Sequence, residues 1–338
     1  MHPPLIVANG EPRLWRGESR RGVSFLLLHL RPKAFVDTMA SMFDLIRSNK
    51  RNSFLLMSFF VLIFAAMGYL VAYLYNDYFW FGFFLVVAFL ITFFTYQYSD
   101  SIVLKLSLAK PVTEQENPYL YNVIDGLAIA AGMPAPRAYI IEDGAPNAFA
   151  TGRDPQHAVI CVTTGLLEKM NRLELEGVIA HEMSHIKNYD IRFMTMVTVL
   201  VGTVALLSDW LRRSFFWGGG RRSSRRVATK GSAALIFVAL AIIAAILAPL
   251  LAKLIQLAIS RQREYLADAS GAQLTRYPEG LASALEKITA DTEPLEVANK
   301  ATAHLYIVNP LIEHRSMLNN LFSTHPPAEE RIRRLRSM

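Results

Sequence analysis

Two histidines four residues apart, with a glutamate directly after the first, are the residues of this chain best suited to chemistry. They stand in the run HEMSH as His181, Glu182 and His185. On an α-helix, residues i and i+4 project from one face, so both imidazoles can bind a single Zn²⁺ ion while the glutamate faces a water on that ion. The motif therefore predicts two metal ligands and a general base within about one turn of helix.

A zinc site of this kind needs a third protein ligand, and the downstream run SRQREYLADASGA offers one. Glu264 and Asp268 are again four residues apart, so Glu264 can bind the metal while Asp268 accepts the distal N–H of a ligand histidine. The alternative is a solvated helix face on which Arg261 or Arg263 neutralises the acids. The upstream HEMSH run favours metal binding, with one Zn²⁺ per chain.

These runs, together with PNAFATG, AVICVTTGLLEKM and STHPPAEERI, resemble the HtpX family of membrane zinc metalloproteases, gluzincins related to the CAAX prenyl proteases. The resemblance covers roughly residue 40 to the C-terminus. It implies a multi-pass α-helical membrane protein with an α+β zincin-type metalloprotease domain that is mainly helical. Together with the site chemistry it predicts a zinc endopeptidase in which zinc-activated water attacks the peptide bond and Glu182 is the general base.

The resemblance also implies residues that contact the substrate. In the family, a histidine with an arginine six residues later faces the bound substrate, and His325 and Arg331 match that spacing as donors to the developing oxyanion. A plain basic C-terminal helix is the alternative. Asn147 and Ala148 in PNAFATG carry over as substrate-binding residues, although Asn147 would equally suit a turn after a strand.

Hydrophobic residues make up 52% of the chain and charged residues only 19%, and the apolar residues are concentrated in four stretches. Residues 54–74 and 79–96 contain no charge and predict a transmembrane hairpin. Residues 232–252 form a third stretch of membrane length. Residues 193–211 are a weaker candidate for a membrane span, because they contain threonines and, near their end, Asp209. They form either a span or a helix that packs against the others.

These patterns divide the chain into five regions. The first two are an N-terminal extension of little order (1–38) and an amphipathic lead-in with the transmembrane hairpin (39–98). A catalytic α+β region with the HEMSH helix follows (99–192), and then a region (193–258) that holds the third and fourth hydrophobic helices (193–211 and 232–252) and a basic loop (212–231). The last is a C-terminal catalytic region with the third zinc ligand (259–338).

Within the catalytic region, apolar spacing and β-branched residues predict helices at Thr113–Gly132 and Leu173–Tyr189 and strands at Arg137–Glu142 and Ala158–Thr163. Unpaired backbone near Ala158–Thr163 is expected to bind an extended peptide. Polar residues on both sides of HEMSH place the zinc helix near the membrane surface rather than inside the bilayer.

The net charge of +7 and the pI of about 9.5 raise the possibility of an anionic partner. The arginines cluster beside the hydrophobic stretches, where membrane topology and anionic lipid explain them, and no nucleic-acid motif accompanies them. The expected partners are therefore the lipid bilayer and unfolded or misfolded membrane proteins, in a quality-control role. A catalytically silent scaffold of the same fold is the rival function, and retention of Glu182 and Glu264 argues against it.

The distribution of basic residues predicts the orientation in a bacterial-type inner (plasma) membrane. Nine Lys and Arg in residues 1–53 place the N-terminus in the cytoplasm, and the hairpin returns the catalytic region to that side. His181 and Glu264 flank the two later stretches, so these must begin and end on one side if both residues bind the same ion. The side of the basic loop is left open, and the lone Cys161 excludes an internal disulfide.

Overall fold

A computed structural model describes residues 20–203, 260–298, 301–310 and 326–338. The chain divides into two units, residues 1–45 and 46–338, and the fold and site described below belong to the second. Helices α1 (Arg20–Tyr75) and α2 (Phe79–Leu106) come first. Among the described residues, two helices are long and apolar enough to cross a membrane, Ile46–Tyr75 and Phe79–Leu106. They contain the predicted hydrophobic stretches 54–74 and 79–96 and extend beyond them.

The start of α1 differs from the sequence prediction. Residues 20–38 belong to this helix, whereas the sequence predicts an extension of little order. Leucine and arginine favour a helix here, whereas Gly22 and Pro32 oppose one, so the sequence of this segment alone does not specify a helix. Residues 1–19 lie outside the described residues, as does the predicted helix at 232–252 with its basic loop.

Four short strands form one sheet in the order β1-β2-β4-β3. They are β1 (Lys110–Pro111), β2 (Arg137–Ile141), β3 (Ala148–Thr151) and β4 (Val159–Thr163). Strand β4 runs parallel to β2 and antiparallel to β3, and all five of its residues are buried. Its continuous apolar run fits a strand that is covered on both faces.

The position of β4 corrects one expectation. Its backbone is paired with β2 on one side and β3 on the other, so it cannot bind an extended peptide, as the sequence analysis expected for Ala158–Thr163. The edge strands of this sheet are β1 and β3 instead. The error came from not predicting β3, whose sequence AFAT is short and half alanine and owes its extended form to pairing with β4.

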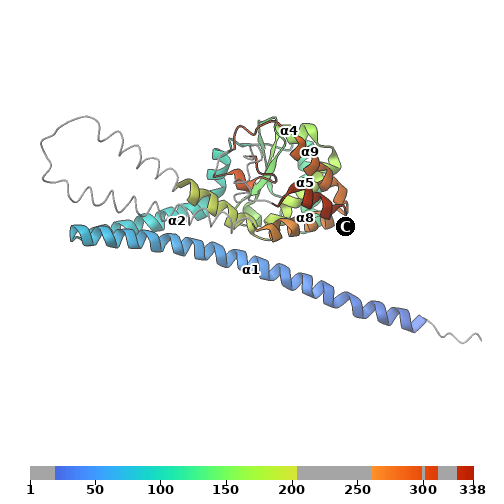
Figure 1. Cartoon of the computed structure of the whole chain (residues 1–338), viewed down its shortest axis with the longest axis horizontal. Helices are drawn as coiled ribbons and strands as arrows, with labels where there is room; N and C mark the ends of the chain where they lie inside the picture. The colour runs from blue at the N-terminus through green and yellow to red at the C-terminus, as the bar shows by residue number, and fades with distance from the viewer. Residues whose placement is uncertain (1–19, 204–259, 299–300, 311–325) are drawn as a thin grey trace, which may run out of the picture. The chain divides into compact units, whose positions relative to one another are not determined.

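Helices cover the sheet and place α5 (Arg172–Lys187) at the centre of the domain. The others are α3 (Pro118–Ala131), α4 (Thr164–Lys169), α8 (Arg261–Thr275), α9 (Pro278–Ala290) and α10 (Ala328–Leu335), with 3₁₀ turns at η1 (Pro155–His157) and η2 (Ala303–Leu305). Figure 1 shows α5 among α4, α8 and α9, with the strands behind them. Every residue of α5 from Gly177 to Ile186 is buried, which identifies α5 as a helix of the core.

Local sequence signals set both ends of α5. The Asn171 side chain accepts from the Glu174 backbone N–H while the Glu174 carboxylate accepts from the Asn171 N–H, a reciprocal capping box. The Glu174 carboxylate also accepts from Ser283 (2.6 Å) and Lys287 (2.7 Å) on α9. One acidic residue thus begins the metal-motif helix and joins it to its neighbour.

After α5 the chain turns and continues as a helical segment over residues 190–203. Its apolar side chains, among them Phe193, Met196 and Leu200, pack against Leu56 and Phe60 of α1. The described part of the predicted stretch 193–211 is therefore a helix that packs against the first membrane helix, and its remainder lies outside the described residues.

Candidate active site

Helices α5 and α8 approach each other closely at His181. A Cβ added to Gly271 of α8 would lie 3.0 Å from the backbone nitrogen of His181, so a side chain there would push the helices apart. A Cβ on Gly177 of α5 would lie 2.6 Å from the Leu281 nitrogen of α9. These two glycines allow α5 to be enclosed by its neighbours, and the contact at Gly271 brings the acidic first turns of α8 towards HEMSH.

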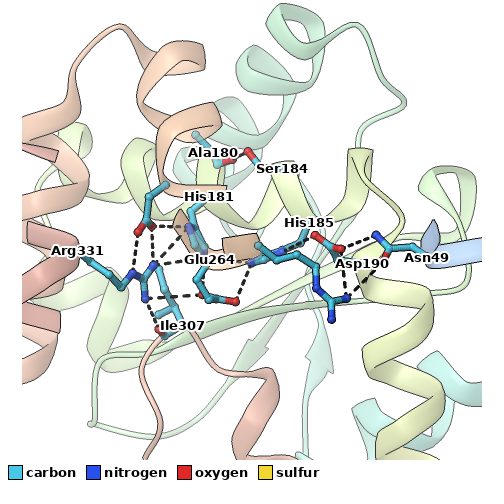
Figure 2. Close-up of polar contacts among 11 residues, drawn as sticks. Asn49, Ala180, His181, Ser184, His185, Asp190, Glu264, Ile307 and Arg331 are labelled. Carbon is cyan, nitrogen blue, oxygen red and sulfur yellow. Dashed lines mark hydrogen bonds and ion pairs between the residues drawn. The ribbon is translucent and has the colours of Figure 1, made fainter. Parts of the chain in front are cut away.

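Three side chains converge where α5 and α8 meet (Figure 2). One ligand atom each of His181, His185 and Glu264 lies within 4.8 Å of the others, and all three residues are buried. The two histidine Nε2 atoms are 3.2 Å apart, and the Glu264 oxygens lie 3.7 Å from His181 Nε2 and 3.6 Å from His185 Nε2. Tetrahedral zinc with bonds of about 2.0–2.1 Å separates its ligand atoms by roughly 3.3–3.4 Å. The donor types and their spacing therefore fit zinc.

A carboxylate lies behind each histidine. Asp268 Oδ1 is 2.9 Å from His181 Nδ1, the contact that the sequence analysis predicts for Asp268. Asp190 Oδ2 is 3.1 Å from His185 Nδ1. A proton on each Nδ1 satisfies these carboxylates and leaves each Nε2 lone pair directed into the donor cluster, the tautomer that metal binding requires.

The electrostatics of the cluster favour a cation. Burial lowers the pKa of His185, but the hydrogen bond that its Nδ1–H donates to Asp190 and the negative charge of Glu264 outweigh this effect and raise that pKa to about 9. For Asp268, burial raises the pKa, and the charge of Arg331 with the hydrogen bond from His181 lowers it overall. Acids thus surround the two histidines, and a positive ion between them is stabilised.

Arg331 of α10 lies fully inside this site (Figure 2). Its Nε and Nη2 donate to the two oxygens of Asp268 at 2.8 and 2.6 Å, and its Nη1 donates to the Ile307 oxygen at 2.9 Å. Nη2 also lies 3.4 Å from His181 Nδ1. The structure therefore brings Arg331 next to the donor cluster, with its guanidinium engaged by Asp268 and the backbone.

Glu182 is buried on α5, with an exposed fraction of 2%. Burial raises the pKa of Glu182, an effect that the nearby His181 and His185 partly oppose. Glu182 is the one acid in HEMSH, and it is separate from the donor cluster.

Of the residues predicted to contact substrate, Asn147 and Ala148 lie in the described part of the chain and His325 does not. Asn147 is buried, and its Nδ2 donates to the Val308 oxygen at 3.0 Å, while the Ala148 oxygen accepts from the Ile307 N–H at 2.9 Å. Both residues lie at the start of edge strand β3 and contact the segment that also receives Arg331. His325 lies outside the described residues.

The sequence analysis assigned no role to Asp190. It lies only five residues after His185, but its contact depends on Tyr189, whose φ of 60° turns the chain in the left-handed region. A tyrosine rarely adopts this conformation, so the spacing alone would not indicate that Asp190 points back at His185.

Comparison with known proteins shows the family. The sequence model of a family described as "Peptidase family M48" matches residues 114–338, which include every residue of the donor cluster. The chain belongs to this family. Curated relatives include the Protease HtpX homologs of Dictyoglomus thermophilum, 52% identical over 301 residues (88% of this chain, 94% of that protein), and of Thermoanaerobacter pseudethanolicus, 47% identical over 302 residues (88% and 98%). The resemblance to HtpX proteases is confirmed, and the chain is a membrane metalloprotease.

Among solved structures, the crystal structure of S. mikatae Ste24p is similar, with a TM-score of 0.46 and 21% identity. The match covers 86% of this chain and 66% of that chain.

Proposed function

We propose that this membrane metalloprotease is a zinc endopeptidase with its active site on the cytoplasmic side of a bacterial-type inner membrane. The observation that carries the proposal is the buried cluster of His181, His185 and Glu264, whose ligand atoms lie within 4.8 Å of one another. Glu182 stands directly after the first of them and is buried beside the cluster. These residues supply a metal-binding set and a separate proton acceptor.

His181, His185 and Glu264 would hold the ion, and Asp268 and Asp190 orient the two imidazoles. When bound, zinc would supply Lewis-acid chemistry that polarises the scissile carbonyl and makes a water more acidic. Glu182 accepts the proton of the attacking water and returns it to the leaving amine, and a pKa raised by burial suits an acid that must do both. We keep His325 and Arg331 as proposed donors to the developing oxyanion; Arg331 also positions Asp268.

The proposed substrates are unfolded or misfolded membrane proteins. An extended peptide beside edge strand β3 would bond through its main chain, so cleavage would depend on an unfolded backbone more than on one side chain. Asn147 precedes that strand and Ala148 begins it, and the Ala148 oxygen accepts from the Ile307 N–H, a contact that a bound peptide would replace. This requirement supports a role in quality control of damaged or misfolded membrane proteins.

Two glutamine variants of the intact purified chain test the mechanism. Glu182→Gln is expected to keep bound zinc and to lose casein hydrolysis by at least about 100-fold, because the amide preserves shape and removes the base. Glu264→Gln is expected to lower zinc affinity itself by more than about tenfold, since it alters a ligand. Zinc content and hydrolysis are measured with and without a chelator.

Glu176→Gln is the matched control, because Glu176 lies on the same helix and its carboxylate pairs with the exposed Arg172 (2.9 Å). It should hydrolyse casein at the wild-type rate. Strong residual hydrolysis by Glu182→Gln would remove Glu182 as the base, and full zinc content in Glu264→Gln at the same free zinc would remove Glu264 as a ligand.

A further inference from the structure

A buried asparagine on the first membrane helix contacts the turn that follows the metal-motif helix (Figure 2). Asn49 of α1 is 3% exposed, and its Nδ2 donates to the Asn188 oxygen at 2.9 Å and to Asp190 Oδ1 at 2.6 Å. Its Oδ1 accepts from Arg263 Nη1 at 3.3 Å. Both amide hydrogens and the amide oxygen are thus used, which offsets the cost of burying a polar side chain.

The turn that Asn49 contacts is conformationally demanding. Asn188 caps α5, and Tyr189 follows in the left-handed region, which costs a residue with a bulky side chain roughly 1 kcal/mol or more. Lys50 Nζ lies 4.2 Å from the centre of the Tyr189 ring, and the Arg192 guanidinium lies 5.1 Å from it. Two consecutive residues of α1 therefore contact the turn, one through its amide and the other through its charge.

The turn directs Asp190 back at His185. Its two carboxylate oxygens have different partners: Oδ1 accepts from Asn49 and lies 3.7 Å from Arg263 Nη1, while Oδ2 faces His185 Nδ1 at 3.1 Å. Asp190 is 2% exposed, so water does not compete for these contacts. The orientation of the His185 ring is consequently set by a chain of contacts that begins on the membrane helix.

We infer that Asn49 is a positioning residue of the metal site, and that α1 is a structural part of that site as well as a membrane helix. The inference rests on the proposed metal-binding role of His185. Groups that orient a ligand histidine typically change metal affinity by about 10–100-fold when they are lost. Asn49 acts through one such group, so its loss is expected to weaken zinc binding about tenfold.

The test uses the intact chain reconstituted in lipid nanodiscs and two readouts that do not depend on hydrolysis. The first is the rate at which bound Zn²⁺ passes to a chromogenic chelator, and the second is the visible absorption spectrum of the Co²⁺-substituted protein, which reports the geometry of the ligands. Asn49→Leu removes the amide at similar volume, so zinc release should accelerate about tenfold and the cobalt spectrum should shift.

Ser53→Ala is the matched control. Ser53 lies one turn further along α1, is 1% exposed, and donates to the Asn49 backbone oxygen within the helix (2.9 Å). Its removal should leave zinc release at the wild-type rate. In an Asp190→Ala background, Asn49→Leu should add no further acceleration, because the intermediate carboxylate is already absent.

The inference is overturned if Asn49→Leu releases zinc at the wild-type rate and has an unchanged cobalt spectrum. It is also overturned if Asn49→Leu accelerates zinc release by the same factor in the Asp190→Ala background as in the wild-type chain. If Asn49→Leu does not fold, as judged by gel filtration, Asn49→Ser replaces it, since its hydroxyl is too short to reach Asp190. A wild-type chain that binds no zinc would instead contradict the proposed function.

Discussion

Arg331 is a buried cation shared between Asp268 and the backbone oxygen of Ile307. Two parallel hydrogen bonds to one carboxylate require the planar fork of arginine, which lysine cannot reproduce. Replacing the arginine leaves Asp268 as a buried charge without its main partner, and breaking such pairs is strongly destabilising. The same contact holds the carboxylate that orients His181, so stability and metal geometry depend on one residue.

Arg331→Met is expected to lower the free energy of unfolding of the metal-free protein by about 3–5 kcal/mol. Adding Asp268→Asn should restore part of the loss, because the uncompensated charge is then removed. Thermal unfolding in detergent measures both. Arg333→Met is the control, since Arg333 lies on the same helix in a surface pair with Glu330, and it should change little. Equal stabilities of the Arg331 and Arg333 variants would show that the buried pair contributes nothing.

The site residues divide into those that local spacing predicts and those that need the fold. His181 and His185 are four residues apart, and so are Glu264 and Asp268. Each pair can be proposed from the sequence because residues at this spacing lie on one face of a helix. That α8 meets α5 at His181 depends on Gly271, 90 residues after it in the chain, and no local rule predicts that contact. Asp190 and Asn49 were missed for the same reason, because one depends on an unusual tyrosine turn and the other on a contact across 141 residues.

At the scale of elements, the close contact at Gly271 sets the distance between the two helices that carry the donor cluster. Gly271→Ala places a methyl group 3.0 Å from the His181 nitrogen, so α8 must shift by a few tenths of an ångström. We expect zinc release to a chelator to accelerate several-fold. Gly126→Ala in α3 is the control, because a Cβ there meets no atom within 4 Å, and alanine in a helix is favoured over glycine by roughly 0.5–1 kcal/mol. An unchanged Gly271→Ala variant would show that the helices tolerate a wider spacing.

Glu174, the acid in the capping box of α5, predicts a pH dependence of stability. Burial raises the pKa of Glu174, but Lys287, Ser283 and the Asn171 backbone outweigh it and lower the pKa below 4.5. A lowered folded-state pKa contributes stability that is present above about pH 4.5 and is lost as the pH falls through the folded value. Glu174→Gln should therefore lower the melting temperature by about 3 °C at pH 7 and by less at pH 4. A constant difference between these pH values would contradict this assignment.

The two predicted strands of the catalytic domain match β2 and β4 to within one residue, whereas α3 begins at Pro118 and not at the predicted Thr113. The Asn171 cap and the left-handed Gly132 at the end of α3 are local signals, and helices end near them in the structure. Strand β1 has only two residues and β3 only four, so neither shows an alternating pattern long enough to recognise. Their extended form comes from pairing with β2 and β4, which are distant in sequence or joined by a loop.

For the whole molecule, orientation in the membrane is the property that most needs a direct measurement. Tyr78, in the turn between the two membrane helices, is 80% exposed, and Ile129 on α3 is 82% exposed. The native Cys161 is fully buried, and burial raises the pKa of its thiol, so it should not react in the folded protein. Single cysteines at the two exposed positions can therefore be labelled without removing it.

With the proposed cytoplasmic active site, Tyr78→Cys should react with an impermeant maleimide added to intact cells, and Ile129→Cys should react only after the cells are opened. Labelling is read on a gel, with the wild-type chain as the background control. The opposite pattern would place the catalytic domain outside the cytoplasm.

The buried pair of Arg331 with Asp268 has a consequence for the order in which the protein is made. His181 is synthesised 150 residues before Arg331, and Asp268 is synthesised 63 residues before it. While the chain is growing, the metal-motif helix leaves the ribosome without the residue that holds Asp268 against His181. The contacts of Arg331 with Asp268 and His181 therefore cannot form until after all three members of the donor cluster, His181, His185 and Glu264, have been synthesised.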